Sequence, residues 1–270
     1  MIYRDLQKNI LNTCFKGKVI LLLGARQVGK TTLLKEVISQ IKEPSVWLNA
    51  DEADVLQAFE TANTSTQLLQ LIGVGNKLVI IDEAQQISDI GRKLKLIYDS
   101  HPEIQVIATG SSSFELQDRM AEPLTGRKRT FYLYPLSYKE ISRSRSVLEA
   151  RRLLETRLIF GSYPEVVSNR GEEKTILTEI ATSYLYKDIL KSDTIRKPAH
   201  IEKLLRALAF QIGNEVNFHE LAQTIGNIDT ATVEKYIDLL EKTFIIFKLP
   251  ALSRNLRNEI KKGKKYYFYD

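Results

Sequence analysis

The chain has 270 residues, 43% of them hydrophobic and 27% charged, with 39 Lys and Arg against 33 Asp and Glu and a formal charge of +6. This composition is typical of a soluble protein with one large domain or two smaller ones. The single cysteine, Cys14, excludes an internal disulfide. No apolar run reaches the roughly 18 residues of a membrane span, and the charged residues Arg4, Asp5 and Lys8 exclude a secretory signal. We therefore expect a cytoplasmic protein without membrane contact.

Short apolar runs alternate with helical patterns in the first half of the chain. After a short amphipathic helix within 1–15, the runs typical of strands lie at 19–23, 46–48, 78–81, 106–108 and 131–133. Longer helical patterns lie between them, for example at 31–41 and 89–100. Strands that alternate with helices predict an α/β fold with a parallel sheet covered on both faces. From about residue 138 to 212 the pattern becomes helical, and short helices and β-like runs follow.

The first strand-like run leads directly into a phosphate-binding motif. Its residues fit G-x-x-x-x-G-K-[ST] and are followed by Thr32; they are Gly24, Ala25, Arg26, Gln27, Val28, Gly29, Lys30 and Thr31. The two glycines allow backbone N–H groups to converge on phosphate oxygens at the start of a helix. Lys30 is placed to bridge the β- and γ-phosphates and Thr31 to hold Mg²⁺. We therefore expect this phosphate loop, residues 24–31, to bind ATP with Mg²⁺.

The run at 78–81 ends in two carboxylates, Asp82 and Glu83. At the carboxyl end of a parallel strand they lie beside the phosphate loop, where ligands of open α/β sheets bind. Asp82 suits the outer shell of Mg²⁺, and Glu83 is placed to polarise an attacking water. The D-x-x-G and N-K-x-D patterns of GTPases are missing, and a small-molecule kinase needs no catalytic glutamate here. The pair favours ATP hydrolysis over the alternative of a solvated strand end.

With these motifs, the chain resembles AAA+-type ATPases of bacteria and archaea that join a phosphate-loop domain to an uncharacterised, nuclease-like C-terminal domain. The matching segments are GARQVGKTTLL (24–34), LVIIDEAQ (78–85), IATGSSSFEL (107–116), LTGRKRTFYLYPLS (124–137), GSYPEVV (161–167) and TATVEKYIDLLEKTFIIFKLP (230–250). The resemblance implies a five-stranded core of order 5-1-4-3-2 over 1–137, a helical lid over 138–198 and a winged-helix module over 199–270. Because such relatives continue into the nuclease-like domain from about where this chain ends, we expect that domain to be absent here. We assign no nuclease activity, because no second carboxylate cluster beyond Asp82 and Glu83 has the needed strand context.

The resemblance also implies roles for polar residues around the phosphate loop. Thr109 and Ser111 are both candidates to sense the γ-phosphate, although a flexible serine turn is the alternative for 111–113. Asn49, at the end of the second strand, is the candidate to restrain Glu83. Arg127 is the candidate to reach a phosphate, either in its own site or in a neighbouring subunit of a homo-oligomer, or else to form a salt bridge within its own lid.

The predicted lid departs from the common pattern. Its turn, 161–164, ends in Pro164, which we expect to pack against the nucleotide. Glu165 follows where lids of this type commonly place an arginine that contacts the γ-phosphate. A lid without that arginine predicts a slow, ATP-gated switch rather than a processive motor.

The C-terminal third raises the question of DNA. The predicted helix-turn-helix pair lies at 218–225 and 230–241, but segment 229–242 carries a net charge of −2, which favours a packed helix with an acidic surface over a DNA reader. The loop 251–265 has a net charge of +5, because Glu259 opposes six cations: Arg254, Arg257, Lys261, Lys262, Lys264 and Lys265. A wing hairpin with these charges predicts phosphate contact without sequence readout; a solvated loop that protects a sheet edge is the alternative. The second functional hypothesis is thus a DNA-associated regulator that holds ATP with little turnover, and an unknown protein client stays open as a partner.

Overall fold

The computed structural model describes residues 2–111, 123–184, 198–252 and 263–270. The chain divides into two compact units, Met1–Glu173 and Lys174–Asp270. In the part of the chain that is described, no helix combines the length and the hydropathy that crossing a membrane requires.

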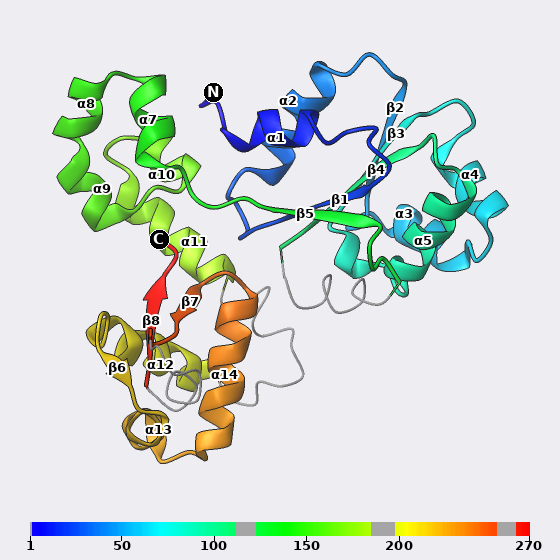
Figure 1. Cartoon of the computed structure of the whole chain (residues 1–270). Coiled ribbons are helices and arrows are strands. Elements are labelled where there is room, and N and C mark those ends of the chain that lie inside the picture. The colour runs from blue at the N-terminus through cyan, green and yellow to red at the C-terminus, as the bar shows by residue number, and fades with distance from the viewer. Residues whose placement is uncertain (1, 112–122, 185–197, 253–262) are drawn as a thin grey trace. The chain divides into compact units, whose positions relative to one another are not determined.

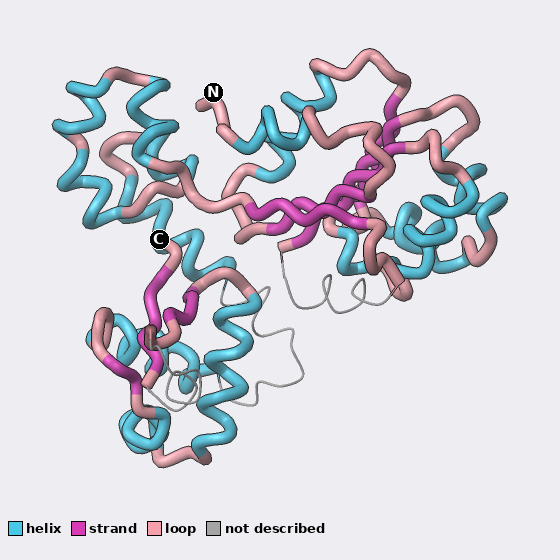
Figure 2. Tube along the Cα trace, viewed as in Figure 1, coloured by secondary structure: helices cyan, strands magenta, loops and turns pink. Residues whose placement is uncertain are grey.

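The first unit is built on a five-stranded parallel sheet (Figures 1 and 2). Its strands are β1 (Val19–Leu23), β2 (Ser45–Asn49), β3 (Leu78–Asp82), β4 (Gln105–Gly110) and β5 (Lys128–Tyr132). Their order is β2-β3-β4-β1-β5, which is the order that the resemblance implies. The predicted α/β fold with a parallel sheet is therefore confirmed.

The position of each strand in the sheet explains its composition. All residues of β1, β3 and β4 are buried, because these central strands are covered on both faces. The edge strands β2 and β5 are only partly buried and carry polar and aromatic residues. The apolar run predicted at 131–133 therefore marked only the end of β5, which starts at Lys128 and pairs with β1 along its whole length.

Helices cover both faces of this sheet, and Figure 1 shows α1 and α2 on one side and α3, α4 and α5 on the other. Further short helices follow β5. The described helices of this unit are α1 (Leu6–Leu11), α2 (Lys30–Ser39), α3 (Ala53–Thr61), α4 (Ser65–Ile72), α5 (Ile90–Ser100), α7 (Tyr138–Ser144), α8 (Val147–Arg152), α9 (Leu154–Phe160) and α10 (Pro164–Ser168), with a 3₁₀ turn, η1, at Ala84–Gln86. Polar caps define the starts of two of these helices: Thr64 with Gln67 and Ser137 with Glu140 form complete capping boxes at α4 and α7.

The second unit is helical with a small antiparallel sheet of order β6-β8-β7. Its elements among the described residues are α11 (Glu173–Tyr184), α12 (Pro198–Phe210), β6 (Glu215–Val216), α13 (Phe218–Gly226), α14 (Thr230–Lys242), β7 (Ile246–Leu249) and β8 (Lys264–Phe268). Apolar residues of α12, α13 and α14, among them Leu204, Ile225 and Ile237, form its core. The two-residue strand β6 was not predicted, because so short a segment has no detectable alternation.

The basic segment 251–265 differs from the predicted loop at its end. Lys264 and Lys265 lie in β8, opposite Val216 and Glu215, so the prediction that places them in the loop is wrong. The cause is the pairing with β6, which extends the strand two residues beyond its apolar part. The other four predicted cations of this segment, Arg254, Arg257, Lys261 and Lys262, lie outside the described residues.

Candidate nucleotide site

The phosphate loop adopts a backbone conformation that its glycines make possible. Gly29 caps α2 with a φ of 95°, a left-handed conformation that residues with a Cβ rarely adopt. At Gly24 a Cβ atom would lie 2.3 Å from the carbonyl oxygen of Leu133, which follows β5. Both glycines of the motif are thus required by the local geometry.

Lys30 lies inside this loop and is 6% exposed. Its Nζ donates to the carbonyl oxygens of Gly24 (2.8 Å) and Ala25 (2.9 Å). These bonds satisfy a buried ammonium group. The contacts hold the charge at the loop that is expected to bind phosphates.

The predicted metal residues lie together at the carboxyl edge of the sheet. The Thr31 hydroxyl donates to Asp82 Oδ2 at 3.1 Å, and Asp82 is buried. Hard oxygen groups of this kind fit Mg²⁺, which is commonly held by one or two protein oxygens together with substrate phosphates. The described residues contain no cluster of three or more His, Cys, Asp or Glu that would hold a metal by protein groups alone.

The two candidate sensor residues at the end of β4 have different partners. Thr109 is fully buried; its hydroxyl donates to Asp82 Oδ1 and accepts from the Glu83 backbone N–H at 3.1 Å. Ser111 instead donates to Glu83 Oε2 at 3.3 Å. Thr109 therefore orders the strand end that carries Asp82, whereas Ser111 contacts the predicted catalytic carboxylate.

A further partner of Glu83 was missed in the sequence. Gln85, in the turn η1, is 6% exposed and its Nε2 donates to Glu83 Oε2. The only signal in the sequence is that Gln85 follows Glu83 by two residues. The direction of the Gln85 side chain depends on how the chain turns at η1.

Asn49 does not restrain Glu83, so that prediction is wrong. Its amide donates to Glu52 Oε1 at 3.4 Å and accepts from the Asp51 backbone N–H at 3.2 Å. The chain turns sharply after β2, and these local bonds direct the Asn49 side chain back onto its own loop.

Arg127 lies at the edge of the sheet opposite the phosphate loop. Its carbonyl oxygen accepts from the N–H of Val19, the first residue of β1, at 2.9 Å. Gly24 lies beyond the other end of that strand, about 16 Å further at 3.3 Å per residue. The Arg127 guanidinium pairs with Asp99 of α5 at 2.9 Å. The prediction that Arg127 reaches a phosphate of its own site is therefore wrong. The alternative prediction, a salt bridge within the lid, is also wrong, because Asp99 belongs to α5. A role toward a neighbouring subunit stays a prediction.

A cavity of about 360 Å³ adjoins the phosphate loop. It is lined by Ile2, Tyr3, Arg4 and Gln7 from the N-terminal segment, by Gly29, Thr32, Leu33, Glu36 and Gln40 around α2, and by Leu136, Pro164 and Ser168. Pro164 Cγ is 3.8 Å from the position of a Cβ at Gly29. The predicted nucleotide residues Thr32 and Pro164 therefore share a cavity next to the loop, of a size suited to part of a small ligand.

Arg4 connects this cavity to the loop and was not predicted. Its guanidinium donates to the Val28 carbonyl oxygen (3.1 Å), to the Tyr134 carbonyl oxygen and to Glu140 Oε1 (3.2 Å). Burial lowers the pKa of Arg4, and the Glu140 carboxylate opposes this effect. The sequence offers no signal for this contact, since its partners lie more than 20 residues away along the chain.

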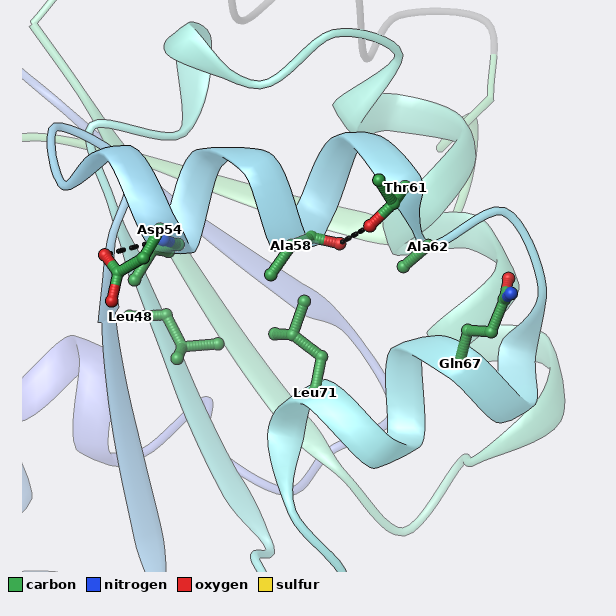
Figure 3. A pocket seen from close by; sticks show the side chains of 8 residues that line it. Leu48, Asp54, Ala58, Thr61, Ala62, Gln67 and Leu71 are labelled. Atoms are coloured by element: carbon green, nitrogen blue, oxygen red, sulfur yellow. Dashed lines mark hydrogen bonds between the residues drawn. The ribbon is translucent and has the colours of Figure 1, made fainter.

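A second cavity, of about 420 Å³, lies between β2, α3 and α4 (Figure 3). Leu48, Ala58 and Leu71 line its apolar side, and Asp54 is the charged residue among the described ones around it. The Asp54 carboxylate accepts from the Val55 backbone N–H. Because the described residues that line it include no basic side chain, this cavity does not suit phosphate.

Cys14 is buried, and this burial raises the pKa of its thiol to about 11. The thiol therefore stays protonated at neutral pH and is a poor nucleophile.

A comparison with known families finds a match for the part of the chain that carries the phosphate loop. Residues 16–142 match the family model described as an AAA domain. Over these residues the chain is similar to AAA domains. Residues 151–270 match a second model, described as a domain of unknown function, DUF8612. The boundary between the two matches falls within the short helices α7 and α8 that follow the sheet.

One solved structure is similar in fold to this chain. It is a Walker-type ATPase of Pyrococcus abyssi, with a TM-score of 0.65 and 17% identity, covering 100% of this chain and 94% of that one. At this identity the likeness shows the fold alone.

The curated relatives are uncharacterised proteins from distant organisms. One from Methanocaldococcus jannaschii is 24% identical over 92% of this chain and 59% of its own length. Another, from Haemophilus influenzae, is 25% identical over 92% of this chain and 66% of its own length. The chain thus spans about three fifths of the length of the curated relatives that it matches.

Proposed function

We propose that this protein binds ATP together with Mg²⁺ and hydrolyses it slowly, as a nucleotide-gated switch. The observation that carries the proposal is the chain of hydrogen bonds at the carboxyl edge of the sheet. It runs from Thr31 of the phosphate loop through Asp82 and Thr109 to Glu83. These are the groups that bind a metal–triphosphate and activate water in phosphate-loop ATPases.

Each residue has a definite task in this proposal. Backbone N–H groups of the loop bind the phosphates, and Lys30 exchanges the carbonyl oxygens of Gly24 and Ala25 for β- and γ-phosphate oxygens. Thr31 and Asp82 hold Mg²⁺, which supplies positive charge that neutralises the phosphates. Glu83 orients a water and accepts its proton as the water oxygen bonds to the γ-phosphorus. The bond from the γ-phosphorus to the β–γ bridging oxygen breaks, and ADP leaves. The nucleoside enters the cavity beside Arg4 and Pro164.

Slow turnover follows from the residues around Pro164. Pro164 starts α10 and lines the cavity, whereas the next residue, Glu165, is exposed to solvent. No lid arginine at this position neutralises charge that develops on the γ-phosphate.

Replacing Lys30 with alanine should abolish the stabilisation of the protein by ATP. A ligand present at 100 times its Kd stabilises the folded state by about 2.7 kcal/mol, so wild-type protein should show a clear rise in Tm with Mg-ATP. The Lys30→Ala protein lacks the cation that faces the phosphates and should show no such rise. Differential scanning fluorimetry with and without Mg-ATP measures both proteins.

Lys35→Ala is the matched control, because Lys35 is exposed on the same helix, α2. It should behave as wild type. A Tm rise in Lys30→Ala as large as that of wild type would rule out the proposed phosphate site.

A second candidate function is DNA contact by the second unit. We infer a winged-helix module there, because α12, β6, α13, α14, β7 and β8 follow one another in chain order with the sheet order β6-β8-β7. Glu241, one of the acidic residues of α14 that argue against DNA, pairs at 3.7 Å with Lys248, which lies outside segment 229–242 and is not counted in its charge. The net charge of −2 thus overstates the negative potential of this helix.

Replacing Lys261, Lys262, Lys264 and Lys265 with serine should weaken the binding of duplex DNA and reduce its salt dependence. The slope of log K against log salt is negative, and each lost phosphate contact reduces its magnitude by about 0.9. Fluorescence anisotropy of a labelled duplex at several salt concentrations measures both effects. The control replaces exposed lysines of the first unit, Lys8, Lys16, Lys42 and Lys95, with serine and removes the same charge. Equal binding by the two variants would contradict contact through this segment.

A further inference from the structure

The backbone at Glu83 has an unusual conformation that directs its side chain. Glu83 has a φ of 52°, a left-handed conformation that is uncommon for a residue with a side chain. Its N–H donates to Thr109 Oγ1 at 3.1 Å, and the chain then enters the turn η1. Strained residues of this kind persist where the surrounding structure holds them in place.

Two buried donors hold the Glu83 carboxylate through one oxygen. Gln85 Nε2 donates to Oε2, and the Ser111 hydroxyl donates to the same oxygen at 3.3 Å. Gln85 Nε2 also lies 3.4 Å from Ser111 Oγ, so the three side chains form one cluster. Gln85 and Ser111 are 6% and 2% exposed, whereas Glu83 is half-buried. The two donor residues are thus more buried than the residue whose carboxylate they contact.

The hydrogen bonds from Gln85 and Ser111 direct the Glu83 side chain toward the phosphate loop. Ser111 directly follows β4, which lies in the sheet between β3 and β1. A side chain drawn from the end of β3 toward the end of β4 is therefore drawn toward β1, whose carboxyl end continues into the phosphate loop. Asn49, on the other neighbour β2, does not contact Glu83.

We propose that Gln85 is a positioning residue that, with Ser111, orients the Glu83 carboxylate for the attack of water on ATP. The proposal rests on the proposed hydrolytic function. With Oε2 held by protein donors, Oε1 is left to accept the proton of a water. A base oriented by a third group is a recurrent arrangement in catalytic sites. The residue that positions Glu83 in this proposal, Gln85, thus lies in the turn after β3, whereas the sequence predicted Asn49 at the end of β2.

The test compares Gln85→Met with Gln86→Met. Methionine has nearly the length of glutamine and lacks the N–H donors, and Gln86 is the exposed neighbour in the same turn. The steady-state release of phosphate gives kcat and KM, and a fluorescent ATP analogue gives the Kd. We expect Gln85→Met to lower kcat roughly tenfold, with KM and Kd within about twofold of wild type, because orientation acts on the transition state. Gln86→Met should match wild type.

A second comparison separates positioning from a general structural effect. In a Glu83→Gln background, adding Gln85→Met should cause no further fall in kcat, because there is no longer a carboxylate to orient. An additional fall in that background would overturn the proposal. If Gln85→Met does not fold, Gln85→Asn keeps the amide but shortens its reach by one methylene, and it should lower kcat by a smaller factor.

The outcomes distinguish this inference from the proposed function. If wild type hydrolyses ATP, Glu83→Gln hydrolyses it at least about 100-fold more slowly, and Gln85→Met (or Gln85→Asn, where it serves as the variant) keeps the wild-type kcat, the positioning role is overturned and the function stands. A loss of kcat matched by an equal loss of ATP affinity overturns the positioning role as well. Absence of turnover in wild type overturns both, because no reaction then exists for Gln85 to assist.

Discussion

Replacing Glu83 with glutamine is expected to lower the rate of ATP hydrolysis at least about 100-fold and to leave ATP binding unchanged, because a general base contributes about 10²–10⁴-fold to such a step. Glutamine keeps the size of the side chain and its hydrogen bond to Ser111, but it cannot accept the proton of the attacking water. Lys30, Thr31 and Asp82, which are expected to bind the phosphates and the metal, stay intact. Release of phosphate and the Kd of a fluorescent ATP analogue measure the two effects separately.

The same assay examines the rate of the wild-type protein and includes a control. Without a partner, we expect wild type to turn over less than about once per second, near the low end of ordinary enzyme rates. Glu43→Gln removes an exposed carboxylate before β2 and should leave the rate unchanged. Equal hydrolysis by wild type and Glu83→Gln would rule out Glu83 as the base, and turnover well above this rate would rule out the slow switch.

The second large effect is expected at Glu140, whose replacement with alanine should destabilise the first unit by about 3–5 kcal/mol, the range found when one partner of a buried ion pair is removed. Glu140 Oε1 accepts from Arg4 Nε at 3.2 Å and from the Asp5 N–H at 2.9 Å, and Oε2 accepts from the Ser137 N–H at 2.9 Å. The side chains of Arg4 and Glu140 are 10% and 7% exposed. Alanine at 140 would leave the Arg4 guanidinium buried without its counter-ion and remove the side-chain half of the capping box of α7 that Glu140 supplies.

Thermal unfolding followed by circular dichroism measures this loss, which corresponds to a fall in Tm of roughly 6–20 °C for a protein of this size. Arg143→Ala is the control, because Arg143 also joins α7 to the N-terminal segment, through Asp5, but this pair is exposed. Arg143→Ala should lower the free energy of unfolding by less than about 1 kcal/mol. A fall in Tm for Glu140→Ala no larger than that of Arg143→Ala would contradict the role of the buried pair.

The sequence by itself determined the features whose geometry is local. The motif at 24–31 requires a glycine turn between a strand and a helix, and the structure has that turn, with Gly29 in a left-handed conformation at the start of α2. The order of the parallel strands followed from the family resemblance, and the ends of β1 and β3 follow from buried apolar runs. The placement of Thr31 next to Asp82 follows from the fact that parallel strands end at one edge of the sheet.

Only the tertiary structure decided how side chains from distant segments meet. Arg127 precedes β5, and pairing in a parallel sheet places it at the edge away from the phosphates. Arg4 meets Val28 and Glu140 across 24 and 136 residues of sequence, and Gln85, not Asn49, holds Glu83. Hydrophobic periodicity reports which face of an element is buried, whereas the partner of a buried polar group depends on the direction of each side chain after packing. Those directions are set jointly by all the elements around the site, and a single sequence does not contain them in readable form.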